Sequence, residues 1–160
     1  MRNGIIIVDH GSRREESNRM LERVAELFGR RFHERYDIVE PAHMELAEPS
    51  IATAFARCVG RGAGRVVVCP FFLGPGKHWT QDIPALTAAA AEKFPGTRYH
   101  VAPTLGVDDL ILDLLDKRAS HCVGHEFVCD VCRGTNRSGE CAGANGDGAK
   151  AAPVAGATLP

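Results

Sequence analysis

Two histidines each follow closely on an apolar segment of the chain. His10 lies in the motif DHGSR at residues 9–13, directly after the apolar residues 4–8, and His78 lies in the segment GPGKHW at residues 74–79. In an open parallel α/β sheet, ligands bind outside the carboxyl ends of the strands. Two imidazoles at that edge can bind a divalent metal ion or transfer protons. The residue types and their places therefore predict metal or proton chemistry at one edge of a sheet.

A carboxylate, two basic side chains and an indole accompany these histidines. Glu45 follows the second predicted strand and suits a third metal ligand or a proton acceptor, the alternative being a solvated loop glutamate. Arg13 and Lys77 flank the histidines and suit a ligand with several carboxylates, although each alone also fits an ordinary surface charge. Trp79 is the one tryptophan, and it either supports a flat apolar ligand or simply packs.

Alternating apolar and amphipathic segments must position these side chains. Strands are predicted at residues 4–9, 36–40, 65–69 and 98–102, and helices at residues 14–32, 48–59, from 82 or 84 to 93, and 108–121. Ser12 and Glu15 fit a capping box at the start of the first helix. The alternation predicts an α/β fold in which helices cover both faces of a four-stranded parallel sheet.

Composition and charge exclude several classes of protein. The 160 residues carry a formal net charge of −1, which argues against nucleic-acid binding. The sequence has no apolar run of about eighteen residues, so no membrane span is expected. The chain enters its first strand without a leader segment, so we expect that any organelle address was removed or never present.

Three segments differ in composition. Residues 1–121 are expected to form one domain with a substantial apolar core. Residues 122–141 are rich in cysteine, glycine and arginine, and residues 142–160 consist largely of small residues. The last segment cannot bury enough surface to offset its ordering entropy, so we expect it to be disordered.

Several motifs together resemble the small sirohydrochlorin chelatases, the single-domain form of the class II chelatases. They are DHGSR at 9–13, PAHMELAEP at 41–49, PFFLGPGKHW at 70–79 and DIP at 82–84, in the family's order, and the resemblance spans residues 1 to about 122. It implies a flavodoxin-like three-layer sandwich that inserts Fe²⁺, or Co²⁺, into sirohydrochlorin without a nucleotide. It also implies a homodimer that imitates the two halves of longer chelatases.

The resemblance assigns roles to particular residues. The family's two metal-binding histidines fall on His10 and His78, and its acidic partner falls on Glu45. Sirohydrochlorin is a large flat ring with eight carboxylates, and metal insertion removes two pyrrole protons. A further set of side chains near the histidines is expected to contact this substrate: Ser12, Arg13, Lys77 and Trp79.

The six cysteines fall into two groups. Cys58 and Cys69 lie in a predicted helix and a predicted strand and are interpreted as small core residues. The other four cluster near the end of the chain, at Cys122, Cys129, Cys132 and Cys141. Plant members of the family carry a similar C-terminal cluster that binds a [2Fe–2S] centre, for which four thiolates are suitable ligands. Tetrahedral zinc and disulfides stay open, because the spacing does not distinguish them.

The sequence thus favours a sirohydrochlorin ferrochelatase, in the chloroplast stroma if the source is a plant or alga and otherwise in the cytoplasm. One alternative is a sirohydrochlorin cobaltochelatase of cobalamin synthesis. Another is a non-enzymatic metal or iron–sulfur carrier or redox sensor, in which the cysteine segment is the functional part. Histidine-based phosphotransfer is disfavoured, because such enzymes usually have arginine before the histidine and here Asp9 precedes His10.

Overall fold

The structure is a computed structural model, and it describes residues 2–125. Four parallel strands form one sheet in the order β2-β1-β3-β4, with β1 at Arg2–Asp9, β2 at Ile38–His43, β3 at Ala63–Pro70 and β4 at Arg98–Val101. The helices are α1 at Glu15–Arg31, α2 at Ile51–Gly60, α3 at Ile83–Ala91 and α4 at Asp109–Gly124, and a short π-helical turn, η1, spans His78–Asp82. The described residues fall into two units, residues 2–106 and residues 107–125.

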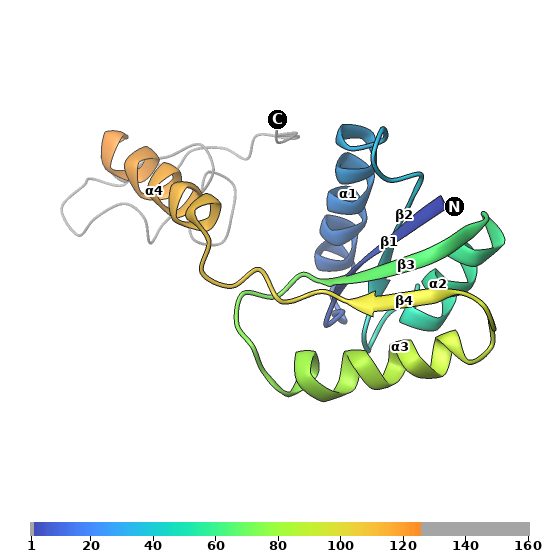
Figure 1. Ribbon diagram of the computed structural model, residues 1–160. Helices are drawn as coiled ribbons and strands as arrows, with labels where there is room; N and C mark the ends of the chain where they lie inside the picture. Colours follow the sequence, from blue (N-terminus) through green and yellow to red (C-terminus); the bar gives the residue numbers. More distant parts are fainter. Residues whose placement is uncertain (1, 126–160) are drawn as a thin grey trace. The chain divides into compact units, whose positions relative to one another are not determined.

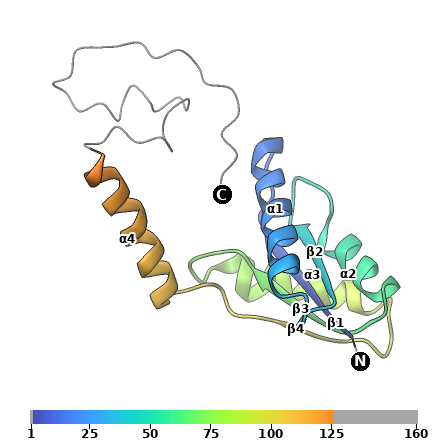
Figure 2. The ribbon, with the colours of Figure 1, turned by 90° about the horizontal axis from the view of Figure 1, so that it is seen from above.

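The first unit is a three-layer α/β sandwich, as the sequence predicts. Alternate residues of β1 point to opposite faces of the sheet, as in any strand. Ile6 and Val8 pack with Phe55 of α2 in one core cluster, whereas Ile5 and Ile7 pack with α1 in the other. Figure 1 shows α1 on one side of the sheet and α3 on the other, and Figure 2 shows the strands lying between α1 and α2.

The two cysteines assigned to the core lie where the sequence analysis placed them. Cys58 on α2 is fully buried, and Cys69 on β3 is half-buried against the α1-side cluster. Burial and the nearby Glu40 carboxylate raise the pKa of the Cys58 thiol to about 12. Burial also raises the pKa of the Cys69 thiol. Both thiols therefore stay protonated at neutral pH and behave as small apolar side chains.

Strand β2 is longer than predicted, and this difference matters for the site. The expected strand ended at Glu40, because proline usually interrupts a strand, but β2 continues through Pro41 to His43. Proline is tolerated there because β2 is an edge strand, with only β1 as its neighbour. The longer pairing brings His43 opposite Asp9 at the end of β1.

The starts of two helices differ in detail from the prediction. The first helix begins at Glu15 with no side-chain cap, because the Ser12 hydroxyl instead accepts a hydrogen bond from the Arg14 amide at 3.0 Å. The second begins at Ile51 rather than near residue 48. Its N-cap is Ser50, whose hydroxyl accepts from the Thr53 amide at 3.3 Å. Short side-chain bonds to the backbone, rather than propensity, decide both boundaries.

The second unit contains the predicted last helix, α4. Its N-cap is Asp108, whose carboxylate accepts a hydrogen bond from the Leu110 amide at 2.9 Å. Leu110, Leu114 and Leu115 are all exposed. Three of the clustered cysteines (Cys129, Cys132 and Cys141) and the tail expected to be disordered lie outside the described residues. Within residues 2–125, no helix has both the length and the apolar character that a membrane crossing needs.

Candidate functional site

The strand order places the two histidines beside each other. The chain passes from β1 to β2 on one side and then to β3 on the other, so β1 and β3 are neighbours whose following loops diverge. In open α/β sheets such a switch point is where ligands bind. His10 directly follows β1 and His78 begins η1 after β3, and their ring centroids are 5.2 Å apart with the planes at 65°. The predicted histidine pair is therefore brought together at this edge.

Hydrogen bonds define which ring nitrogens are available. The Nδ1 atom of His10 is 3.2 Å from the Gly11 carbonyl oxygen, and Nδ1 of His78 is 2.9 Å from Asp82 Oδ2. Both partners only accept hydrogen bonds, so Nδ1 carries the proton in each ring. The unprotonated Nε2 of each neutral imidazole is left as a metal ligand or a proton acceptor.

Asp82 is a partner of His78 that the sequence analysis missed. It expected an irregular loop through residue 79, whereas His78 and Asp82 are the first and last residues of η1. Their separation of four residues places the two side chains on one side of the helical turn. A carboxylate on the far nitrogen of a histidine fixes its tautomer and raises its basicity as a ligand. The four-residue spacing of His78 and Asp82 was the signal in the sequence for this contact, once a helical turn is assumed.

Glu45 lies near His10, but Glu45 and the two histidines do not form a complete metal-binding site. Its Oε2 atom is 3.9 Å from His10 Nε2, and its side chain is exposed. Its backbone is held close, because the Glu45 amide donates to the His10 carbonyl at 3.0 Å. Across the described part of the chain, no three His, Cys, Asp or Glu side chains converge as a complete metal site. The arrangement offers two imidazoles and a more distant carboxylate, which leaves coordination positions open for other ligands.

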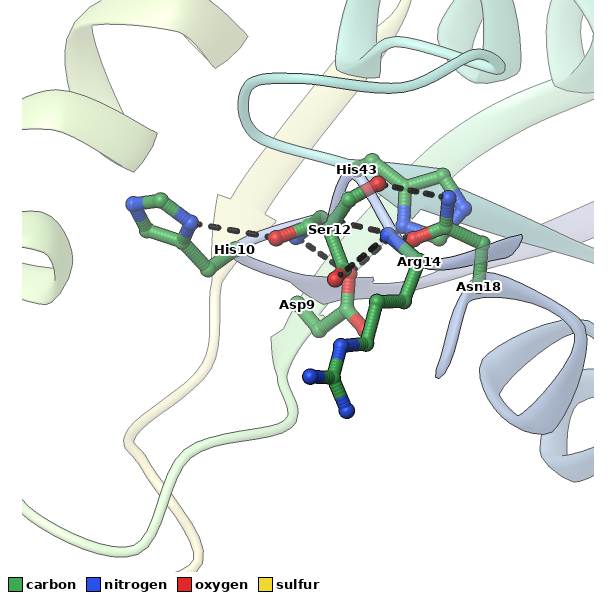
Figure 3. A network of polar contacts seen from close by, with 7 residues as sticks. Asp9, His10, Ser12, Arg14, Asn18 and His43 are labelled. Atoms are coloured by element: carbon green, nitrogen blue, oxygen red, sulfur yellow. Dashed lines mark hydrogen bonds and ion pairs between the residues drawn. The ribbon is translucent and has the colours of Figure 1, made fainter. Parts of the chain in front are cut away.

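The turn that carries His10 is held by a hydrogen bond to the Asp9 side chain, which also bonds to His43. The Asp9 Oδ1 atom accepts from the Gly11 amide at 2.9 Å and from His43 Nδ1 at 2.6 Å. Figure 3 shows His10 pointing away from this network, while Asp9 and His43 lie within it. Sequence reasoning missed the Asp9–His43 pair because it placed His43 in a loop. A histidine within the otherwise apolar stretch Ala42-His43-Met44 was the signal for a buried polar contact.

The four residues expected to contact a substrate differ in their surroundings. Arg13 and Lys77 are exposed, and neither forms an ion pair within residues 2–125. The indole N–H of half-buried Trp79 donates to the Ala102 carbonyl at 3.0 Å, which ties η1 to the chain just after β4. The Ser12 backbone exchanges two hydrogen bonds with the Asn18 side chain, both 2.9 Å long.

The histidine pair is partly open to solvent, with 41% of the His10 side chain and 44% of the His78 side chain exposed. A hollow of about 550 Å³ lies elsewhere, lined by residues of α2 together with Lys93 and Phe94, just past α3. None of the predicted site residues lines it. A second hollow of about 170 Å³, lined by α2 and α3, also lacks them. Both imidazoles are therefore accessible to a ligand that approaches this edge of the sheet.

The fold and the site together indicate a metal-binding α/β protein. Two adjacent imidazoles at the switch point of a parallel sheet can hold a cation weakly at an exposed surface. The chain belongs to the CbiX family, whose model matches residues 4–122. This match covers nearly all of the first unit and most of α4.

Curated relatives and solved structures agree with this assignment. The chain is 56% identical over 138 residues to the chloroplastic sirohydrochlorin ferrochelatase of Arabidopsis thaliana, which covers 84% of this chain and 60% of that protein. It is 30% identical to a sirohydrochlorin cobaltochelatase of Sulfurisphaera tokodaii, with 84% of this chain and 98% of that protein covered.

A crystal structure of the sirohydrochlorin chelatase SirB from Bacillus subtilis subspecies spizizenii in complex with cobalt has a TM-score of 0.67. Its sequence is 32% identical, with 75% of this chain and 50% of that chain covered. SirB from Bacillus subtilis has also been solved with Fe³⁺. The present chain spans about half the length of several curated relatives that it matches.

Proposed function

We propose that this protein is a sirohydrochlorin ferrochelatase. The observation that carries the proposal is the pair of facing imidazoles, with centroids 5.2 Å apart, at the switch point of the sheet. The identity to a plant ferrochelatase over most of the chain supports it. The reaction consumes Fe²⁺ and metal-free sirohydrochlorin and yields siroheme and two protons, so charge and atoms balance without a nucleotide.

His10 and His78 are the proposed metal-holding residues. In the neutral form of each ring, Nε2 is the nitrogen without a proton, because the Gly11 carbonyl and the Asp82 carboxylate engage the opposite nitrogens. Two imidazole ligands hold a first-row divalent ion without enclosing it, so the ion can pass to the four ring nitrogens. Borderline nitrogen ligands accept both Fe²⁺ and Co²⁺, which fits relatives named for each metal.

Glu45 is the proposed acceptor for a pyrrole proton, with the two imidazoles as the other candidates. Its carboxylate is solvent-exposed and 3.9 Å from His10 Nε2, so a proton taken from the ring can pass to water. The exposed cations Arg13 and Lys77 are proposed to pair with carboxylates at the rim of the macrocycle. Trp79 and Ser12 are proposed to line the same face.

A homodimer is the proposed functional assembly. The histidine side chains are partly exposed at the edge of the sheet, and a second copy is proposed to supply a wall against the other side of the planar ring. The proposed functional unit is residues 1–121. Because an Arabidopsis relative is chloroplastic, the chloroplast stroma is the proposed location if the source is a plant or alga.

The four C-terminal cysteines are proposed to hold a [2Fe–2S] cluster. They provide the four thiolates that such a cluster requires. Cys122, the member of the set within the described residues, lies half-buried in the last turn of α4. Iron and acid-labile sulfide in equal amounts, with visible absorption in anaerobically purified protein, would support the cluster. Stoichiometric zinc, or neither metal, would contradict it.

The proposed activity is tested with purified protein, sirohydrochlorin and Fe²⁺ under anaerobic conditions. The visible spectrum of the tetrapyrrole should change faster than in the reaction without protein. His10→Ala and His78→Ala should each remove most of that gain, whereas His33→Ala, which alters an exposed histidine just past the end of α1, should not. Equal rates in all four proteins would refute the site. A greater gain with Co²⁺ than with Fe²⁺ would favour a cobaltochelatase instead.

A further inference from the structure

A fully buried histidine, His43, ends β2 and lies opposite Asp9, the residue before His10. The side chain of His43 has no solvent exposure, and its Nδ1 atom is 2.6 Å from Asp9 Oδ1. The Asp9 carboxylate accepts only, so His43 donates through Nδ1 and its Nε2 atom carries no proton in the neutral ring. None of the described residues gives that Nε2 atom a hydrogen-bond partner.

Packing alone does not explain why a histidine occupies this buried position. A buried nitrogen without a partner costs free energy that an apolar side chain of similar volume would not incur. Its neighbours in the chain, Ala42 and Met44, are buried and apolar. Among the described residues, the one side-chain hydrogen bond of His43 is the bond to Asp9, and this bond is the polar contact that offsets the cost.

The Asp9 carboxylate in turn organises the backbone that presents His10. The same oxygen that accepts from His43 also accepts from the Gly11 amide at 2.9 Å. Gly11 has φ +82°, a left-handed conformation that permits the sharp reversal after His10. Because the Asp9 carboxylate accepts from both the His43 ring and the Gly11 amide, it fixes the direction in which the His10 side chain leaves the turn.

The pair also joins the two segments that carry His10 and Glu45. The Met44 amide donates to the Asp9 carbonyl at 2.8 Å, and the Glu45 amide donates to the His10 carbonyl at 3.0 Å. These bonds extend the β1–β2 pairing one step past the end of the sheet, and the His43–Asp9 bond crosses between the same two segments. The separation of the His10 and Glu45 side chains therefore depends on this crossing.

We propose that His43 and Asp9 are positioning residues that hold the His10 turn and the Glu45 backbone in register for metal transfer. Neither side chain touches the metal or the macrocycle. The activity part of this inference rests on the proposed function, whereas its structural part does not. Removing the partners of a ligating histidine at other metal sites lowers affinity or activity about tenfold or more.

The test compares His43→Leu, which removes the donor, with His43→Asn, whose side-chain amide nitrogen keeps a donor near the place of Nδ1. Asp37→Ala is the matched control. It deletes a carboxylate that accepts from the Asn3 amide at 3.3 Å, at the opposite end of the same two strands. Amide hydrogen exchange of Gly11 and Glu45 is measured by NMR, and chelatase kcat and KM are measured on the same full-length proteins.

In His43→Leu, the Gly11 and Glu45 amides should exchange about tenfold faster, while core amides such as that of Ile6 should not change. The value of kcat should fall about tenfold with KM for sirohydrochlorin unchanged. His43→Asn should restore both quantities, and Asp37→Ala should alter neither. Unchanged exchange at Gly11 and Glu45, or a His43→Asn variant that behaves like His43→Leu, would overturn the inference.

Two further outcomes are also decisive. If His43→Leu does not fold, Asp9→Ala is measured in its place, and it should show the same local increase in exchange. If the wild-type protein does not chelate, the proposed function fails. Amide exchange at Gly11 and Glu45 then decides the positioning role by itself.

Discussion

Replacing Gly11 with alanine should destabilise the first unit more than the same replacement at Gly76 or Gly96. Gly11 has φ +82°, and a Cβ atom built on it would lie 2.0 Å from the Glu45 carbonyl oxygen and 3.1 Å from the His43 Cβ. The obstructing carbonyl belongs to the backbone and cannot rotate away as a side chain would. Relief of the clash therefore requires movement of the segment that carries Glu45.

The magnitude follows from two terms. An alanine in left-handed backbone conformation costs about 1–2 kcal/mol. Displacing the Glu45 carbonyl disturbs two backbone hydrogen bonds, Glu45 N to His10 O at 3.0 Å and Ala47 N to Glu45 O at 2.7 Å. Each is worth about 1 kcal/mol. The expected loss is roughly 3 kcal/mol, which lowers Tm by about 13 °C for a unit of this size.

Substitutions at two other glycines separate the cost of the left-handed backbone from the cost of the clash with Glu45. Gly96 has φ +92° but nothing within 4 Å of an added Cβ, and Gly76 has neither a positive φ nor a neighbour. Gly96→Ala should cost about 1 kcal/mol, and Gly76→Ala should be within about 0.5 kcal/mol of wild type. Urea denaturation followed by circular dichroism measures all three. A Gly11→Ala protein as stable as Gly96→Ala would show that the clash with Glu45 is not real.

Three further outcomes are expected. Asp82→Asn should lower chelatase kcat about tenfold, because His78 loses the carboxylate that fixes its tautomer; an unchanged kcat would contradict this role. Ser50→Ala should lower the free energy of unfolding by about 1 kcal/mol in urea titrations, since α2 loses its N-cap, and no change would contradict the capping. The folded-state pKa of Cys58, about 12, exceeds its ordinary value of 9.0. The unfolded chain thus loses this proton first, and the stability gained from the buried thiol is complete below pH 9 and lost as pH rises toward 12. Cys58→Ala should show a smaller loss of stability over that range than wild type, and an equal loss would count against the shift.

The sequence was sufficient to predict the sheet and the histidine pair, and the reason is physical. Buried parallel strands are apolar throughout, so β1 and β3 stand out, and the polar residues of the loops that follow them must lie at the carboxyl edge. The meeting of His10 and His78 then follows once β1 and β3 are neighbours in the sheet. The proximity of Glu45 to His10 follows from β2 lying on the other side of β1.

The supporting contacts could not be predicted in the same way. Proline at residue 41 argued for a strand end, and only the place of β2 at the edge of the sheet makes that residue acceptable. Without the longer strand, His43 had no reason to lie opposite Asp9. Asp82 was overlooked because glycine and proline in residues 74–76 argued for an irregular loop, while a helical turn begins at His78.

The π-helical character of η1 has a consequence for changes in chain length. Its closing bond runs from the Ile83 amide to the His78 carbonyl, five residues back, so this turn contains one residue more than an α-helical turn. Deleting one residue between His78 and Asp82 would let α3 extend smoothly backwards as an ordinary α-helix. The imidazole would then swing by about 100° around the helix axis, away from its counterpart after β1. The wide turn therefore sets the direction of the His78 side chain, and substitution of Thr80 or Gln81 should be tolerated far better than deletion of either residue.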